Sequence, residues 1–146
     1  MLTRSILLML AAALAAGTAI AHSGVTNAAV MTRMHNMKDS AAALKRLGEM
    51  AKGATPFDAG SASDARLQLI SLSQDVPALF EAPETDPLME ARPELWESWE
   101  DFVERAEMST AALRALDVTD LASLRSGLQP VGAACSACHE AYRVEN

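Results

Sequence analysis

The sequence predicts an all-α fold, an antiparallel up-down-up-down four-helix bundle. Apolar or small residues recur at alternating steps of three and four along four segments of the chain, which is the spacing of an amphipathic helix. No segment shows the two-residue alternation of a half-buried strand. Because the connections between the segments are short to medium, neighbouring helices should pack antiparallel in one small domain.

The first two predicted helices span about residues 25–52 and 63–80. Gly53 is a typical stop after the first helix, and Pro77 should weaken the second helix near its end. We expect their core-facing seams to consist of Val30, Met34, Met37, Ala41, Leu44, Gly48 and Ala51 in the first helix and of Ala65, Leu69, Leu72, Val76 and Leu79 in the second.

The third and fourth predicted helices follow a Pro-rich, acidic connection and a tight turn, respectively. The third begins with Pro93 in its first turn and runs to about Leu116. The fourth starts after Thr119, the expected N-cap, and Pro130 inside it predicts a kink or a fresh helical start near Gln129. The expected seams are Trp96, Trp99, Val103, Ala106, Leu113 and Leu116, and then Leu121, Leu124, Leu128, Val131, Cys135, Cys138 and Tyr142.

Residues 1–21 have the pattern of a secretory signal peptide. Arg4 gives a positive start, the stretch ILLMLAAALAA is apolar, and Ala19-Ile20-Ala21 is a small-residue cleavage site. The alternative is a retained membrane anchor, but the apolar run is shorter than the roughly 20 residues that span a bilayer. We expect cleavage after Ala21, which leaves one domain of residues 22–146 in a bacterial periplasm.

The chain is acidic, with a formal net charge of −7. This balance argues against nucleic acid and anionic membrane surfaces as partners, because both attract Lys- and Arg-rich patches. Between residues 81 and 107 stand ten Asp or Glu side chains and two Arg side chains. Such a run is typical of a solvated face, and the sharper alternative is a surface that steers a basic partner protein.

The stretch VGAACSACHEAYR near the C-terminus carries the most specific chemical signal. It holds the only two cysteines, Cys135 and Cys138, with His139 directly after the second. A zinc site would need a fourth ligand, and His22 and His35 form no matching pair. A disulfide across so short a loop would add little stability, and a thioredoxin-like pair would need a strand-to-helix junction.

C-x-x-C-H is the attachment signal of c-type haem, in which the two thiols add across vinyl groups and the histidine ligates iron. Both cysteines continue the seam of the fourth helix, and His139 lies one turn beyond Cys135. The chain is also poor in aromatic residues (4%), so a flat porphyrin would help to fill its core. We therefore expect one covalently attached haem c near one end of the bundle.

Together these features resemble the class II c-type cytochromes, the cytochrome c′ family. The resemblance covers about residues 25–146, and its most specific part is the haem motif near the C-terminus. The stretches RMHNMKDS, LGEMAKGATPFDA, VPALF and RPELWESWEDF also match the family. The resemblance implies a four-helix bundle with haem near one end, commonly a homodimer, and no catalysed reaction.

The family divides by what occupies the sixth position of the iron. In its low-spin branch a methionine of the first helix ligates iron, and the protein carries single electrons between redox partner proteins. Counted back from AKG, the corresponding residue here is Met37, and QPVG before the motif also looks like this branch. The alternative is a five-coordinate iron that binds NO or CO.

Helix geometry leads to the same residue, because the start of the first helix and the end of the last lie level in an antiparallel bundle. Met34 and Met37 should therefore both fall near His139. Packing as core filler is the alternative for Met37, and it is the expected role of Met34.

Three further residues are expected around the haem. Arg33 and Arg143 match basic residues of the family beside the two ligand positions, and Trp96 matches its tryptophan after PE. The alternatives are a solvated helix-end cation for Arg143 and core packing for Trp96. Tyr142 should close the seam of the fourth helix, whereas His35 lies off the first seam and should be exposed.

Overall fold

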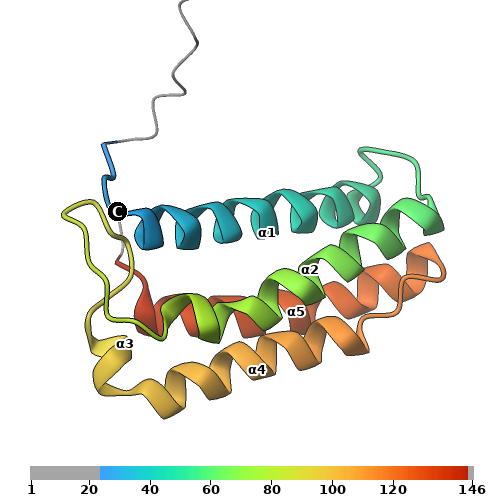
Figure 1. Cartoon of the computed structure of the whole chain (residues 1–146). Coiled ribbons are helices and arrows are strands. Elements are labelled where there is room, and N and C mark those ends of the chain that lie inside the picture. Colours follow the sequence, from blue (N-terminus) through green and yellow to red (C-terminus); the bar gives the residue numbers. More distant parts are fainter. Residues whose placement is uncertain (1–23, 145–146) are drawn as a thin grey trace, which may run out of the picture.

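Four long helices and one short helix form a bundle in the computed structural model, which describes residues 24–144 (Figure 1). The helices are α1 (Ala28–Lys52), α2 (Ala59–Phe80), α3 (Glu94–Glu97), α4 (Trp99–Ala115) and α5 (Leu121–Tyr142). The long helices alternate in direction and pack in the ring α1, α2, α4, α5. The predicted antiparallel four-helix bundle is confirmed. The predicted signal peptide, residues 1–21, lies outside the described residues.

Side-chain caps set the helix starts. Asn27 accepts hydrogen bonds of 2.9 and 3.1 Å from two backbone N–H groups of the first turn, so α1 begins at Ala28 rather than near residue 25. Gly53 ends α1 in the left-handed region, at φ 77°. Asp120 caps α5 by accepting a 2.9 Å hydrogen bond from the first turn, so the prediction of Thr119 as the N-cap was wrong by one residue.

Two prolines lie inside helices without ending them. Pro77 lies within α2 and Pro130 within α5, and both helices are continuous, which excludes a fresh helical start near Gln129. Pro130 lies on an exposed face, where water can bond the carbonyl that loses its helical partner. The third predicted helix is instead divided at Ser98 (φ −117°, ψ 42°), the junction between α3 and α4.

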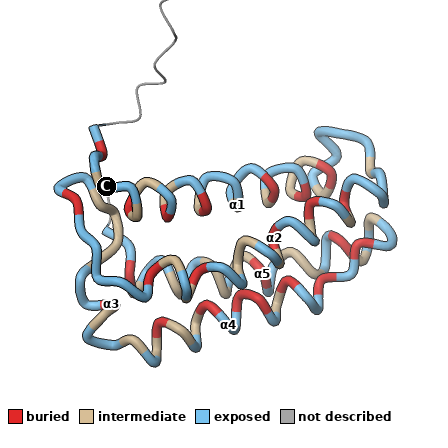
Figure 2. The backbone as a smooth tube through the Cα atoms, in the orientation of Figure 1, coloured by how far each residue is buried: buried red, intermediate tan, exposed pale blue. Residues whose placement is uncertain are grey.

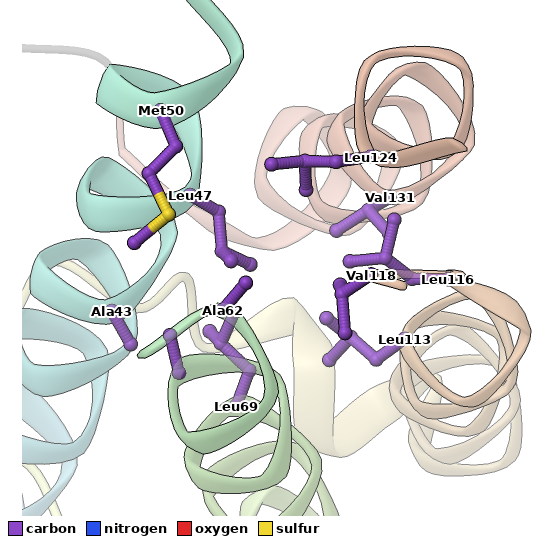
Figure 3. Packing of buried hydrophobic residues seen from close by; sticks show 11 residues of the cluster. Ala43, Leu47, Met50, Ala62, Leu69, Leu113, Leu116, Val118, Leu124 and Val131 are labelled. Carbon is purple, nitrogen blue, oxygen red and sulfur yellow. The ribbon is translucent and has the colours of Figure 1, made fainter. Parts of the chain in front are cut away.

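The core consists of two clusters of buried side chains. We call the end where α1 begins and α5 ends the near end. Figure 2 shows the buried residues on the sides of the helices that face one another. The far cluster draws on all four long helices and comprises Ala43, Leu47, Met50, Ala62, Ala65, Leu69, Leu113, Leu116, Val118, Leu124 and Val131 (Figure 3). The near cluster comprises Val76, Phe80, Leu95, Phe102, Ala106 and Tyr142.

Within residues 24–144, no helix combines the length and the apolar composition that crossing a bilayer requires.

Candidate functional site

A cavity of about 360 Å³ opens at the near end of the bundle, between the first half of α1 and the last turns of α5. Among the neighbouring long helices, these two have the least direct contact, which leaves room between them. Side chains of α2, α4 and the connection between α2 and α3 form the remaining walls. The wall is mostly apolar, and the side formed by α1 consists of Val30, Arg33, Met34, Met37, Lys38 and Ala41.

The face that α1 buries differs from the predicted core-facing seam. Arg33 and Asn36 are buried, whereas Met34 and Met37 line the cavity. The predicted seam was wrong beyond Val30, because the residues that α1 buries are displaced from it by one position and include two polar side chains that turn toward α2 and the connection after it. The residues buried in its place are Arg33, Asn36, Ala43, Leu47 and Met50. Asn36, for example, donates a 3.1 Å hydrogen bond from Nδ2 to the backbone carbonyl of Leu72 in α2.

The cysteine motif lies in the last turns of α5. Cys138 lines the cavity, and Cys135, one turn earlier, packs against the far cluster. Both are half-buried free thiols. Burial raises the pKa of both thiols; a hydrogen bond with Ser109 opposes this at Cys135, and the charge of Arg105 opposes it at Cys138. The thiols are therefore protonated at neutral pH.

His139 is exposed at the rim of the cavity, next to Cys138. Partial loss of solvation is the main cause that lowers the pKa of its imidazole; the positive charge of Arg143 lowers the pKa further, and Glu90 opposes both effects. The imidazole is therefore neutral at pH 7, which is the form that binds a metal ion.

Met37 faces the same cavity from α1. It lines the wall together with Met34, while Cys138 and His139 line it from α5. The structure thus brings Met37 of the first long helix and His139 of the last long helix to the wall of one cavity. His35, two residues before Met37, is exposed, as expected.

Arg33 is the most deeply buried charged residue of the described chain, with 3% of its surface exposed. Its guanidinium donates to three backbone carbonyls, at 2.8 Å to Leu79, 2.5 Å to Ala82 and 2.7 Å to Glu84. Burial lowers the pKa of Arg33, and the charge of Glu84 opposes this shift. The side chain thus lines the cavity but bonds the end of α2 and the connection after it.

Trp96 is not part of the cavity wall among the described residues. Its indole N–H donates a 2.7 Å hydrogen bond to the carbonyl of Phe80. The guanidinium of Arg33 lies 5.4 Å from the Trp96 ring and 4.9 Å from the Phe80 ring, within the range of a cation–π contact. Trp96 therefore contacts two residues of the cavity wall, Arg33 and Phe80, without lining the cavity itself.

Arg143 lines the cavity just beyond the end of α5. Its Nε and Nη2 lie 2.9 and 2.8 Å from the same carboxylate oxygen of Glu90. An isolated antiparallel bridge pairs the backbone of Arg143 with Ala91. The connection between α2 and α3 is therefore attached directly to the end of α5, beside His139.

Three carboxylates at the near end of the bundle were not singled out from the sequence: Asp86, Glu90 and Asp101. Asp101 accepts hydrogen bonds from Tyr142 (2.5 Å) and Arg105 (2.6 Å). Its spacing of four residues before Arg105 is a helical ion-pair signal that could have indicated it. Asp86 and Glu90 lie in an irregular connection, where no local pattern predicts their partners.

A haem group fits this set of residues. Two thiols one helical turn apart match two vinyl attachment points, and the neighbouring imidazole is neutral. The apolar wall suits the face of a porphyrin, and the cations Lys38 and Arg143 of the wall suit its carboxylate edge. Cys135, Cys138 and His139 would hold the group, and Met37 lines the cavity from α1.

Comparison with known proteins gives a consistent set of matches. The family model described as cytochrome c′ matches residues 28–143. Cytochrome c-554 of Cereibacter sphaeroides is 40% identical over 111 residues, which cover 68% of this chain and 80% of the relative.

Solved structures share the fold as well. A cytochrome c′ from Rhodobacter sphaeroides has a TM-score of 0.74 and 26% identity, and the match covers 81% of this chain and 96% of that one. Variants of the cytochrome c′ from Alcaligenes xylosoxidans, one bound to nitric oxide and one to carbon monoxide, have a TM-score of 0.71 and 32% identity. Each of these matches covers 80% of this chain and 94% of the other.

Proposed function

The chain belongs to the cytochrome c′ family, whose members bind haem c covalently, and from this premise we propose that it is a one-electron carrier with His139 and Met37 as axial ligands of the iron. The observation that carries the proposal is the cavity that Met37 lines from α1 and His139 from α5. A bound haem iron would supply one-electron exchange, and a methionine ligand favours its reduced state.

The attachment falls to Cys135 and Cys138. Each link would form by addition of the S–H bond across a vinyl double bond, so that the sulfur would bond one carbon and the hydrogen would go to the other. Both cysteines are free within the described chain, and Cys138 lines the cavity, which supports this assignment. His139 would contribute its neutral imidazole, and the apolar side chains of the cavity wall would exclude water from the iron's surroundings.

Export belongs to the same proposal. The pattern of residues 1–21 is that of a signal peptide, and covalent attachment of haem c takes place outside the bacterial cytoplasm. We therefore assign the mature protein to the periplasm, where its partners would be redox proteins.

Gas binding is the second candidate. The Alcaligenes xylosoxidans structures contain nitric oxide or carbon monoxide, and they share the fold of this chain. Under this alternative Met37 would pack against the open face of a five-coordinate iron, as an apolar wall residue.

One absorption experiment separates the two candidates. The natively matured protein is examined at neutral pH, oxidised and reduced, with and without CO. The carrier proposal expects a low-spin spectrum that CO does not change. A high-spin oxidised spectrum with rapid CO uptake by the reduced protein would favour gas binding, and a protein without added porphyrin mass would refute both.

A further inference from the structure

The connection between α2 and α3, residues 81–93, runs across the near end of the bundle from the side of α1 to the side of α5 (Figure 1). It has no regular secondary structure beyond one isolated bridge, yet it is bonded at both ends. We call residues 81–93 the strap. Its attachments bear on the two helices that carry the proposed iron ligands.

The first part of the strap is bonded to α1 by a buried arginine. Arg33 donates to the carbonyls of Ala82 and Glu84, at 2.5 and 2.7 Å, and to the carbonyl of Leu79 at the end of α2. Arg33 lies one helical turn before Met37 on α1. The bonds therefore fix the turn of α1 that precedes the proposed ligand.

A buried aspartate of the strap fixes the start of α1. Asp86 is 9% exposed, and its Oδ2 accepts hydrogen bonds from the backbone N–H groups of Thr26 (2.9 Å) and Asn27 (3.1 Å). Its Oδ1 accepts from the backbone N–H of Leu88 at 2.9 Å, which orders the strap itself. Hydrogen bonds to an ionised acceptor are stronger than those between neutral groups.

The last part of the strap is bonded to the end of α5. The N–H of Arg92 donates to the carbonyl of Tyr142, and the N–H of Val144 donates to the carbonyl of Glu90, both at 2.8 Å. The Glu90 carboxylate also pairs with Arg143. These bonds begin three residues after His139.

Direct packing does little to fix the distance between α1 and α5, because they are the neighbouring long helices with the least contact and the cavity lies between them. Resting on the proposed His139 and Met37 ligation, we propose that the strap sets the gap between the two ligand helices, and that Arg33 and Asp86 are positioning residues that hold Met37 at the sixth position of the iron. Neither residue needs to touch the iron to have this effect.

The first test is Arg33→Lys, which keeps the positive charge but loses the fork that reaches several carbonyls. Losing hydrogen bonds made by a charged group should raise the population of the state with Met37 displaced by about tenfold or more. CO uptake by the reduced protein, which requires a free sixth position, should accelerate by the same factor, and the low-spin signature should weaken.

Arg66→Lys is the matched control. Arg66 also donates to backbone carbonyls, those of Leu113 (3.1 Å) and Arg114 (2.7 Å), but at the far end of the bundle. This variant should leave the spectrum and the rate of CO uptake unchanged. Equal effects of Arg33→Lys and Arg66→Lys would reduce the role of Arg33 to general stability and overturn the proposal.

Asp86→Asn provides a second variant with nearly the same volume, in case Arg33→Lys does not fold. It should accelerate CO uptake in the same direction, because a neutral amide is a weaker acceptor for the N–H groups of Thr26 and Asn27. A spectrum and CO uptake that match those of the unmodified protein would overturn the proposal.

Hydrogen exchange separates failure of this inference from failure of the proposed ligand set. Amides of residues 32–40 in α1 should exchange faster in Arg33→Lys and Asp86→Asn than in Arg66→Lys, whatever ligates the iron. If the unmodified protein takes up CO as a five-coordinate haem protein, the assignment of Met37 fails, and the exchange result still decides whether the strap holds α1. Unchanged amide exchange of residues 32–40 in both variants would overturn the proposal that the strap holds α1.

Discussion

The phenol of Tyr142 donates a 2.5 Å hydrogen bond to the carboxylate of Asp101, which joins the last turn of α5 to the first turn of α4. The same carboxylate oxygen accepts a 2.6 Å hydrogen bond from Nε of Arg105. Tyr142 also lines the cavity. The end of α5 that carries Cys138 and His139 is therefore tied to α4 through one carboxylate.

This carboxylate predicts a pH dependence of stability. Hydrogen bonds from Arg105 and then from Tyr142 are the main causes that lower the pKa of Asp101 below its ordinary value of 3.8. Because the folded pKa lies below the unfolded one, the stabilising effect is present above pH 3.8 and is lost as the pH falls through the folded pKa.

Urea unfolding of the unmodified protein and of Asp101→Asn measures this effect. The unmodified protein should be the more stable at about pH 6, and the difference should narrow as the pH falls toward about 2. Tyr142→Phe keeps the aromatic ring and leaves the hydrogen bond from Arg105 to Asp101 in place. It should therefore lose only part of the stability that Asp101→Asn loses at about pH 6. A difference in the free energy of unfolding between the unmodified protein and Asp101→Asn that stays constant with pH would contradict the role given to Asp101.

Replacing the proposed sixth ligand should change the spin state. Met37→Ala is expected to convert a low-spin protein into a high-spin one that binds CO, because the iron would lose its thioether ligand. Met34→Ala is the control, since Met34 lines the same cavity but is expected only to pack. An unchanged spectrum in Met37→Ala would mean that another side chain ligates the iron.

The ion pair between Glu90 and Arg143 should tune the reduction potential. Glu90→Gln leaves the positive charge of Arg143 unbalanced beside His139, which disfavours the more positive oxidised iron and should raise the potential. Arg143→Gln should lower it. Both side chains are about half exposed (41% and 51%), so each shift should correspond to less than about 1 kcal/mol.

Redox titration of the two variants measures these shifts. Glu140→Gln serves as the control, because it removes an exposed charge directly after His139 without touching the ion pair. An equal rise in potential for Glu140→Gln and Glu90→Gln would show that the pairing with Arg143 has no special part.

The far cluster should determine stability without affecting the site. Leu47 is fully buried, and Leu47→Ala should lower the free energy of unfolding by about 2–5 kcal/mol because it removes apolar contacts and leaves a cavity. Leu67, which is 56% exposed on α2, is the matched control, and Leu67→Ala should change stability by less than about 0.5 kcal/mol.

Chemical unfolding and absorption spectroscopy together check this prediction. The folded Leu47→Ala protein should keep the spectrum of the unmodified one, because Leu47 is not part of the cavity wall. A changed spin state in this variant would show that the two ends of the bundle are coupled.

Much of the fold could be predicted because its signals are local. The spacing of apolar residues located all four long helices, and the seam of the fourth placed Cys135 and Cys138 on the inner side of α5, as the structure shows. The helix starts differ by a few residues where side chains such as Asn27 and Asp120 cap them. Cap choice depends on which of several polar residues meets the first free N–H groups.

The parts that could not be predicted depend on contacts between distant residues. Arg33 is polar, so an apolar pattern places it outside, yet carbonyls about fifty positions later in the chain satisfy its donors in the interior. Asp86 and Glu90 lie in a connection whose path is fixed only by such partners. No periodic pattern carries that information.

The far cluster has a consequence for how freely the site can vary. Nine of its eleven members come from the four long helices and two from the connection between α4 and α5, and none of them belongs to the wall of the cavity. Replacing a side chain of that wall therefore removes no member of the far cluster. One framework can accordingly accommodate different surroundings for its pigment.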